Sequence, residues 1–301
     1  MLVVLCPGQG SQTPGFLNPW LELDSFASVV SSLSEASGID IAKHGTESDA
    51  DTIRDTAVAQ PLIVAASIAS ALELGSGFNA VAGHSVGEFA AAALAGILTP
   101  EDAIRAVSVR SRAMAAAAAL EPTSMAAVLG GEQSVVLERL EQLDLYPANF
   151  NGAGQIVAAG SAEAIAALVA EGPAGARVIQ LQVAGAFHTR YMEPAVAELA
   201  SFASGLAPAS PTRRIWSNQA GQEITDGREY VGLLVGQVAS SVRWDACMRS
   251  FADAGVTAVL EVSPAGALAG LAKRALPGIE ILALKTPDQL DAARALIANH
   301  S

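Results

Sequence analysis

A serine flanked by glycines, between a strand and a helix, is the feature that most limits how this 301-residue chain can fold. The apolar run Ala80-Val81-Ala82 predicts a short buried strand. It leads into Gly83-His84-Ser85-Val86-Gly87 and then into an alanine-rich stretch that predicts a helix ending near Gly96. Glycines suit a tight strand-to-helix turn because side chains have no room there, and such a turn holds a serine hydroxyl exposed at the helix start. Ser85 is therefore a candidate nucleophile, with the Val86 N–H aimed at a developing oxyanion; an ordinary turn is the alternative.

The rest of the chain alternates strands and helices, with one interruption. The pattern predicts a strand over 2–6, helices over 56–74 and 99–119, and further strands near 213–217, 257–262 and 279–284. Between them, the pattern of residues 124–184 predicts the order strand, helix, strand, strand, helix, strand, which is the ferredoxin-like order. The strands are predicted at 125–129, 146–150, 155–159 and 178–183. The helices are predicted at 132–143 and 162–171. We predict an α/β domain with a mostly parallel sheet flanked by helices, formed by 1–123 and 185–301, and a small α+β subdomain inserted at 124–184.

Composition excludes several classes of function. The net charge is −13 without any run rich in Lys or Arg, which argues against a nucleic acid partner. No stretch reaches the roughly 18 apolar residues of a membrane span, and the apolar N-terminal run is too short for a signal peptide. Cys6 and Cys247 lack metal or redox spacing, so we expect no metal site, and Cys6 is predicted to be an inert core thiol. We expect a cytoplasmic, monomeric protein.

A nucleophilic serine needs a base, and the chain has four histidines. His84 adjoins the serine on the turn, so its side chain should point away and pack or orient a neighbour. His44 lies in a polar stretch and His300 is the next-to-last residue, so both are expected at the surface. His188 remains, just after the inserted subdomain, at the seam where the chain re-enters the large domain. Elimination makes His188 the candidate base.

One arginine falls on an apolar helix stripe. Ala103, Val107, Arg110 and Met114 share one face of the predicted helix, whereas Arg105 and Arg112 fall on a different one. A buried guanidinium needs a partner, because an isolated buried charge is very costly. That partner is either an Asp or Glu of the protein or a carboxylate brought by a substrate, which the guanidinium fork binds with two hydrogen bonds.

Taken together, these segments resemble the malonyl-CoA:acyl carrier protein transacylases of bacterial fatty acid synthesis and the acyltransferase domains of polyketide synthases. The resemblance covers essentially the whole chain. It includes Pro7-Gly8-Gln9-Gly10-Ser11-Gln12, Ala59-Gln60-Pro61, Gly83-His84-Ser85-Val86-Gly87-Glu88, Arg110 placed 25 residues after the serine, Asn149-Phe150-Asn151 with Gly154-Gln155, and Gly185-Ala186-Phe187-His188. It implies a hydrolase-like α/β domain with a ferredoxin-like insert, in agreement with the pattern above.

The resemblance also implies roles. Ser85 would attack the malonyl thioester, His188 would take its proton, the N–H groups of Gln9 and Val86 would form the oxyanion hole, and Arg110 would bind the free malonyl carboxylate. Gln60, Asn151 and Phe187 would line the substrate site, and His84 and Glu88 would have supporting roles. Malonyl-CoA is the implied donor and the phosphopantetheine thiol of a holo acyl carrier protein the implied acceptor, in a ping-pong transfer that needs no bound cofactor.

Two positions bear on details of the implied site. In the family a backbone carbonyl before a Val-x-Trp segment, often in an Asn-Pro pair, orients the histidine; here the segment is Ser240-Ser241-Val242-Arg243-Trp244, so the Ser240 carbonyl is expected to serve. Phe187 matches the Ala-Phe-His form that accompanies malonyl, where Ala-Ser-His accompanies methylmalonyl. A phenyl ring beside the acyl α-carbon leaves little room for a methyl branch.

Other functions stay open at this point. A serine thioesterase or esterase would share the serine and base but would add an Asp or Glu behind the histidine, for which Glu193 and Asp245 are the nearest candidates. A noncatalytic protein that only docks a carrier is a second alternative. The same chemistry in a polyketide or malonate decarboxylase pathway is a third. An acidic carrier needs a local basic patch, for which Arg190, Lys273 and Arg274 are the candidates.

Overall fold

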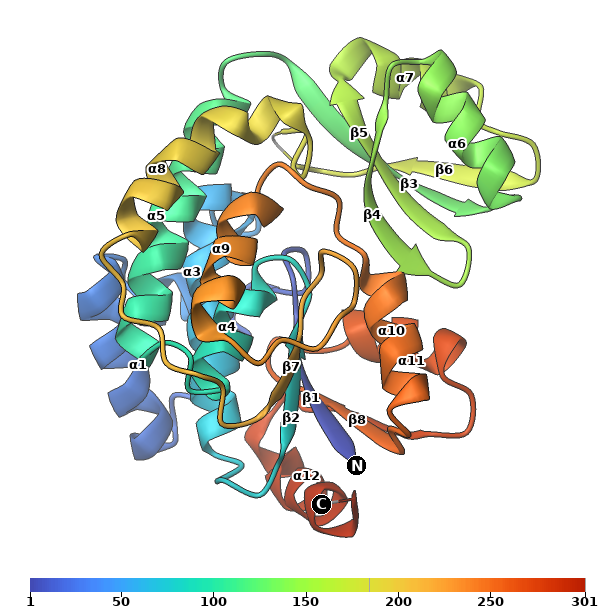
Figure 1. The fold of residues 1–301 in the computed structure, drawn as a ribbon. Coiled ribbons are helices and arrows are strands. Elements are labelled where there is room, and N and C mark those ends of the chain that lie inside the picture. Colours follow the sequence, from blue (N-terminus) through green and yellow to red (C-terminus); the bar gives the residue numbers. More distant parts are fainter. Residues whose placement is uncertain (184, 301) are drawn as a thin grey trace.

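The computed structural model describes residues 1–183 and 185–300, and its centre is a parallel sheet (Figure 1). The order of its strands is β7-β2-β1-β8-β9, with every neighbouring pair parallel. The strands are β1 (Leu2–Cys6), β2 (Ala80–Gly83), β7 (Arg214–Trp216), β8 (Ala258–Glu261) and β9 (Glu280–Ala283). The predicted α/β fold class and these five strand positions are confirmed.

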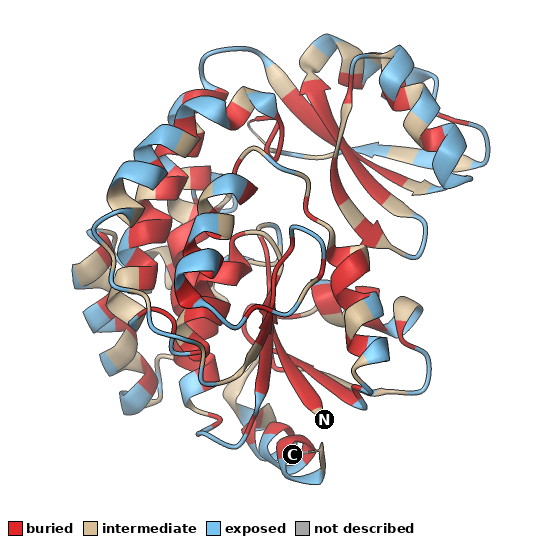
Figure 2. Cartoon of the chain, in the orientation of Figure 1, coloured by how far each residue is buried: buried red, intermediate tan, exposed pale blue. Residues whose placement is uncertain are grey.

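Strand β1 shows why the sheet needs a cover on both faces. All five of its residues are buried (Figure 2). Val3 and Leu5 pack with Trp244 and other residues on one face, whereas Val4 belongs to the larger core on the opposite face. Continuous apolar strands of this kind occur in parallel sheets with helices on both sides.

Helices supply that cover. On one side lie α1 (Asp24–Ser37), α3 (Thr56–Leu72), α4 (Gly87–Leu94), α5 (Pro100–Ala118), α8 (Glu193–Ala203) and α9 (Gly227–Gln237), and on the other lie α10 (Trp244–Asp253) and α11 (Ala267–Ala275) (Figure 1). The remaining helical segments are α2 (Ile41–Thr46), α12 (Leu290–His300) and the 3₁₀ turns η1 (Thr52–Arg54), η2 (Arg190–Met192) and η3 (Pro287–Gln289). Helix α5 starts as predicted, because Thr99 accepts a hydrogen bond from the Asp102 N–H at 3.0 Å and Pro100 takes the first position. Within residues 1–183 and 185–300, no helix combines the length and hydropathy that crossing a bilayer requires.

A second, antiparallel sheet has the order β4-β5-β3-β6, which is the ferredoxin-like order. It consists of β3 (Thr123–Gly130), β4 (Tyr146–Gly152), β5 (Gln155–Ser161) and β6 (Ala176–Gln180), with α6 (Gln133–Gln142) and α7 (Ala162–Ala170) between them. Alternation along β3 divides its side chains: Ala126 and Val128 pack with the two helices, whereas Met125 and Ala127 face the large domain's pocket.

The last strand of this sheet differs from its prediction. A strand over 178–183 is wrong by two to three residues, because pairing with β3 runs from Ala176 to Gln180. The Leu181 N–H still bonds the Met125 carbonyl at 2.9 Å, but Leu181 and Val183 turn into the pocket wall. Residue 184, the predicted end of the insert, lies outside the described residues, so the limits 124 and 184 stay a prediction.

Backbone hydrogen bonds join the small sheet to the large domain. The segment after α9 runs parallel to β4: the Phe150 N–H donates to the Val242 carbonyl, and the Val242 N–H donates to the Ala148 carbonyl, each at 2.9 Å. The Ser241 hydroxyl adds a bond to the Pro147 carbonyl at 2.7 Å. These hydrogen bonds therefore connect the small sheet to the large domain close to the end of α9.

Candidate active site

Ser85 lies on a strained turn between β2 and α4. Its φ angle is +51°, which is unusual for a residue with a side chain. A Cβ on Gly83 would come within 2.1 Å of the Gly87 carbonyl carbon, and one on Gly87 within 2.2 Å of the Cys6 oxygen, so both positions require glycine. Asn218 braces the turn, since its amide accepts from the Ser85 N–H at 2.7 Å and donates to the Gly83 carbonyl at 2.8 Å. The predicted tight turn is present.

His188 meets Ser85 directly. Its Nε2 lies 2.7 Å from Ser85 Oγ, and its Nδ1 lies 2.9 Å from the backbone carbonyl of Gln237. A carbonyl can only accept, so Nδ1 carries the proton and Nε2 is left to accept from the serine hydroxyl. His188 is 6% exposed and has a φ of +63°.

The sequence suggested that the Ser240 carbonyl orients His188. In the structure, the carbonyl that does so belongs to Gln237. Helix α9 ends at Gln237, so this carbonyl has no partner within the helix and is free to accept from the Ser240 N–H at 3.2 Å and from His188. The Ser240 backbone has a smaller effect of the same sign on the pKa of His188.

The electrostatics of the site keep His188 neutral. Burial, and after it the Arg110 charge, lowers the pKa of His188 to about 3, while the Gln237 carbonyl opposes the shift. The imidazole therefore has a free lone pair on Nε2 throughout the neutral pH range.

The other histidines do other things. His84 Nε2 lies 2.9 Å from Asn151 Oδ1, and its ring meets Trp244 edge-on, so it orients a neighbour as expected. His44 and His300, which were expected to be exposed at the surface, are partly buried. They contact Ser48 Oγ at 2.9 Å and Glu280 at 3.2 Å, respectively, and neither lines the pocket around Ser85.

Arg110 is buried, at 1% exposure, and its partners are amides. Its Nη1 donates to Gln60 Oε1 at 2.5 Å and its Nη2 to Gln237 Oε1 at 2.9 Å, with Ser85 Oγ 3.4 Å from Nη2. Among the described residues no Asp or Glu forms an ion pair with it, and its Nε has no acceptor. Burial lowers the pKa of Arg110 to about 10, against the pull of Glu88, so the guanidinium stays charged at neutral pH. The explanation that an Asp or Glu of the protein pairs directly with Arg110 is therefore wrong. Arg105 and Arg112, which were predicted on a different face of the helix, are exposed.

A pocket of about 400 Å³ brings these groups together at the seam between the two sheets. It is lined by Gln9, Gln60, His84, Ser85, Val86, Arg110, Asn151, Phe187 and His188, and also by Met125 and Val157 from the small sheet and Arg274 from α11. Every predicted catalytic and substrate residue thus reaches one space, and Ser240 does not line it. Phe187 is buried in its wall.

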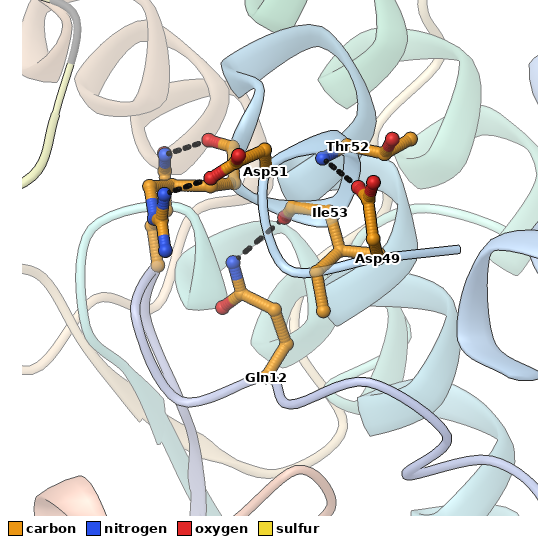
Figure 3. A network of polar contacts seen from close by, with 7 residues as sticks. Gln12, Asp49, Asp51, Thr52 and Ile53 are labelled. Atoms are coloured by element: carbon orange, nitrogen blue, oxygen red, sulfur yellow. Dashed lines mark hydrogen bonds and ion pairs between the residues drawn. The ribbon is translucent and has the colours of Figure 1, made fainter. Parts of the chain in front are cut away.

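The loop after β1 places Gln9 beside Ser85. Gln12 points to the η1 turn and donates to the Ile53 carbonyl at 2.9 Å (Figure 3), and the Ser11 hydroxyl bonds the Gly8 carbonyl at 2.9 Å. Within the described part of the chain, neither the Gln9 N–H nor the Val86 N–H has an acceptor. Both are thus available to a carbonyl oxygen that becomes negative on attack by Ser85.

Neither candidate for a third hydrolase residue reaches the histidine. Asp245 is occupied by Arg243 and Arg249, each at 2.9 Å, and Glu193 is exposed at the start of α8. Two residues that do hold the site, Asn218 and Gln237, were not found from the sequence. Neither lies in a segment whose spacing or neighbours carry a local signal, and both reach the site only through the fold.

Comparison with known proteins gives matches that cover nearly the whole chain. Residues 3–294 match the family model described as acyl transferase domain. The chain is 48% identical over 297 residues to the malonyl CoA-acyl carrier protein transacylase of Mycobacterium tuberculosis, covering 97% of this chain and 98% of that protein. The crystal structure of MCAT from the same species superposes with a TM-score of 0.95 at 48% identity, covering 98% and 99% of the two chains. A malonyl-transacylase in complex with a type II polyketide synthase acyl carrier protein matches with a TM-score of 0.90 at 26% identity, covering 98% and 99%.

Proposed function

Because the chain belongs to the acyl transferase family, among the malonyl-CoA–acyl carrier protein transacylases, we propose that its Ser85 carries the malonyl group between the two substrates. The enzyme is a malonyltransferase that acts between malonyl-CoA and an acyl carrier protein. The observation that carries the proposal is the convergence of Ser85, His188 and a buried Arg110 with no carboxylate partner in one pocket.

The first half-reaction acylates the serine. Ser85 Oγ attacks the thioester carbonyl carbon while His188 Nε2 takes the hydroxyl proton, and the oxyanion lies against the N–H groups of Gln9 and Val86. The carbon–sulfur bond then breaks, and the coenzyme A sulfur takes the proton from His188 Nε2, so coenzyme A leaves as the thiol and the imidazole is neutral again. The second half-reaction reverses these steps with the phosphopantetheine thiol of the carrier, so no resident cofactor is required.

Arg110 selects an acyl group with a carboxylate. Its Nη2 is 3.4 Å from Ser85 Oγ, so a malonyl group esterified to that oxygen can bring its free carboxylate back to the guanidinium. The bound carboxylate also offsets the positive charge that lowers the pKa of His188. Malonyl binding thereby makes the base stronger.

Intact-mass measurement tests the proposal. The purified protein incubated with malonyl-CoA should gain one malonyl group, and added holo carrier protein should remove it and become malonylated. An increment that is lost to water and never reaches the carrier would indicate a hydrolase. No increment, with the thioester shown to be intact, would leave only carrier binding.

The choice of acyl group offers a first prediction. Phe187→Ser should lower the ratio of kcat/KM for malonyl-CoA to that for methylmalonyl-CoA by about tenfold, since one methyl group against an apolar wall is worth about 1–3 kcal/mol. Competition between the two thioesters for serine acylation measures the ratio. An unchanged ratio would show that Phe187 does not set the selectivity.

The carrier surface offers a second prediction. Lys273 and Arg274 are exposed on α11, and Arg274 lines the pocket and donates a hydrogen bond to Gln155 Oε1 at 3.3 Å. Arg190 instead lies outside the pocket. It stacks on Tyr146 and Tyr191, beside Asp144. Reversing the charges of the α11 pair should raise KM for the carrier about tenfold and spare serine acylation, because charge complementarity acts on the encounter with an acidic partner.

Reversal at exposed Arg228 is the control for this effect. Reversal at Arg190 tests the remaining candidate, for which we expect the smaller change. Carrier KM values unaltered in every variant would remove these residues from the docking surface.

The proposed pathway is fatty acid synthesis, and a free-standing polyketide acyltransferase is the alternative. The carrier protein that supports the faster second half-reaction distinguishes them. Use of a coenzyme A thioester favours the predicted cytoplasmic location, and the monomeric state stays a prediction.

A further inference from the structure

Glu88 is a buried carboxyl group for which the reaction above has no task. It is the second residue of α4, only 1% exposed, and lies behind Ser85. Its Oε1 accepts from the Asn218 N–H at 2.8 Å and lies 3.5 Å from the Tyr230 hydroxyl, and its Oε2 accepts from Gln237 Nε2. Each of these three groups donates a hydrogen bond to Glu88, as suits an ionised carboxylate, which can only accept.

Gln237 stands between this carboxylate and Arg110. Its Nε2 donates to Glu88 and also to the Ser85 carbonyl at 3.2 Å, while its Oε1 accepts from Arg110 Nη2 at 2.9 Å. A carboxylate and a carbonyl only accept, and a guanidinium only donates. The amide can satisfy all three neighbours in this orientation alone.

We propose that Glu88 is a positioning residue that compensates the charge of Arg110 through the Gln237 amide, and so leaves the guanidinium's remaining N–H groups to the malonyl carboxylate. The inference rests on the proposed function of Arg110. A carboxylate in direct contact would occupy the same fork that the substrate must use. With an amide interposed, the buried cation has an anion nearby but keeps an unpartnered Nε and a contact with Ser85 Oγ.

The arrangement makes malonyl binding sensitive to pH. Burial raises the pKa of Glu88 to about 8, opposed by the bonds from Asn218 and Gln237 and by the Arg110 charge. The other titratable groups around it, Tyr230 and Cys247, have pKa values raised by burial and stay neutral. A protonated Glu88 would no longer offset the charge of Arg110, and a proton on Oε2 would face the Gln237 NH₂ group, donor against donor. Malonyl loading should therefore decline as the pH falls through the pKa of Glu88, whereas His188, with a pKa of about 3, loses its lone pair only in much stronger acid.

The test is Glu88→Gln, assayed by the rate of serine acylation with malonyl-CoA and with acetyl-CoA, which lacks the carboxylate. At about pH 8.5 the variant should load malonyl about 10- to 100-fold more slowly, the loss expected for one charge-assisted hydrogen bond, with acetyl loading changed less than about threefold. The wild-type decline in malonyl loading toward acidic pH should be absent from the variant.

Glu261→Gln is the matched control. Glu261 is also buried, but its oxygens accept the N–H groups of Gly266, Leu268 and Ala269 at the start of α11. It should keep both the malonyl-to-acetyl ratio and the acid decline of the wild type. Parallel loss of malonyl and acetyl loading in Glu88→Gln, or an unaltered acid decline, would overturn the positioning role. A wild-type protein that takes no malonyl at all would instead remove the proposed function itself.

Discussion

Replacement of Ser85 with alanine is expected to abolish the malonyl-enzyme and to reduce transfer by about 10⁶-fold, the scale seen when a nucleophile that works as a unit with its base is removed. The hydroxyl is the only group of the protein that forms a covalent bond in the proposed reaction, and it lies 2.7 Å from the base. Intact mass after incubation with malonyl-CoA, and carrier malonylation followed over time, measure the two effects.

Ser204→Ala is the matched control, since Ser204 is exposed just after α8. It should acquire the malonyl increment at the wild-type rate. A Ser85→Ala variant that still carried a malonyl group would place the nucleophile elsewhere in the chain and would end the present mechanism.

Truncation of Arg110 to alanine is the second large effect. We expect kcat/KM for malonyl-CoA to fall about 10³-fold, because the substrate carboxylate would enter a buried site without its cation, and loss of one partner of a buried charge pair costs about 2–5 kcal/mol. Acetyl-CoA, which has no carboxylate, should lose much less. The preference for malonyl over acetyl in serine acylation is the informative quantity, because a general loss of folding would lower both rates.

Arg112→Ala controls for changes to helix α5, since Arg112 is exposed two residues along the same helix. It should leave the preference intact. Undiminished malonyl transfer by Arg110→Ala would mean that the arginine is structural, and would favour a hydrolase of neutral acyl groups.

Local patterns were sufficient for most of the fold. The strand before Ser85, the glycines around it and the cap of α5 each depend on neighbours within a few residues, so the sequence carries them directly. His188 was found by elimination among four histidines, and Arg110 by its place on an apolar stripe. The resemblance of these segments to one family then implied roles that spacing alone left open.

Contacts between distant segments were beyond that reasoning. Gln237 bonds Arg110, which is 127 residues away in the sequence, and Asn218 bonds the Ser85 N–H, which is 133 residues away. No pattern in the sequence around Gln237 or Asn218 indicates these contacts. The Ser240 carbonyl was chosen from a sequence landmark, but the acceptor is set by where α9 stops. The end of β6 was misplaced because Leu181 and Val183 are as apolar as a strand while belonging to a pocket wall.

The backbone from Gln237 to Val242 makes contacts that serve two different parts of the molecule. One end of it, at Gln237, fixes the tautomer of His188, and a few residues later Val242 is paired with β4 of the small sheet. Because one short stretch of backbone makes both contacts, the pairing with the small sheet also helps to hold the Gln237 carbonyl against His188. The small sheet is thus a support for the catalytic histidine as well as a wall of the pocket.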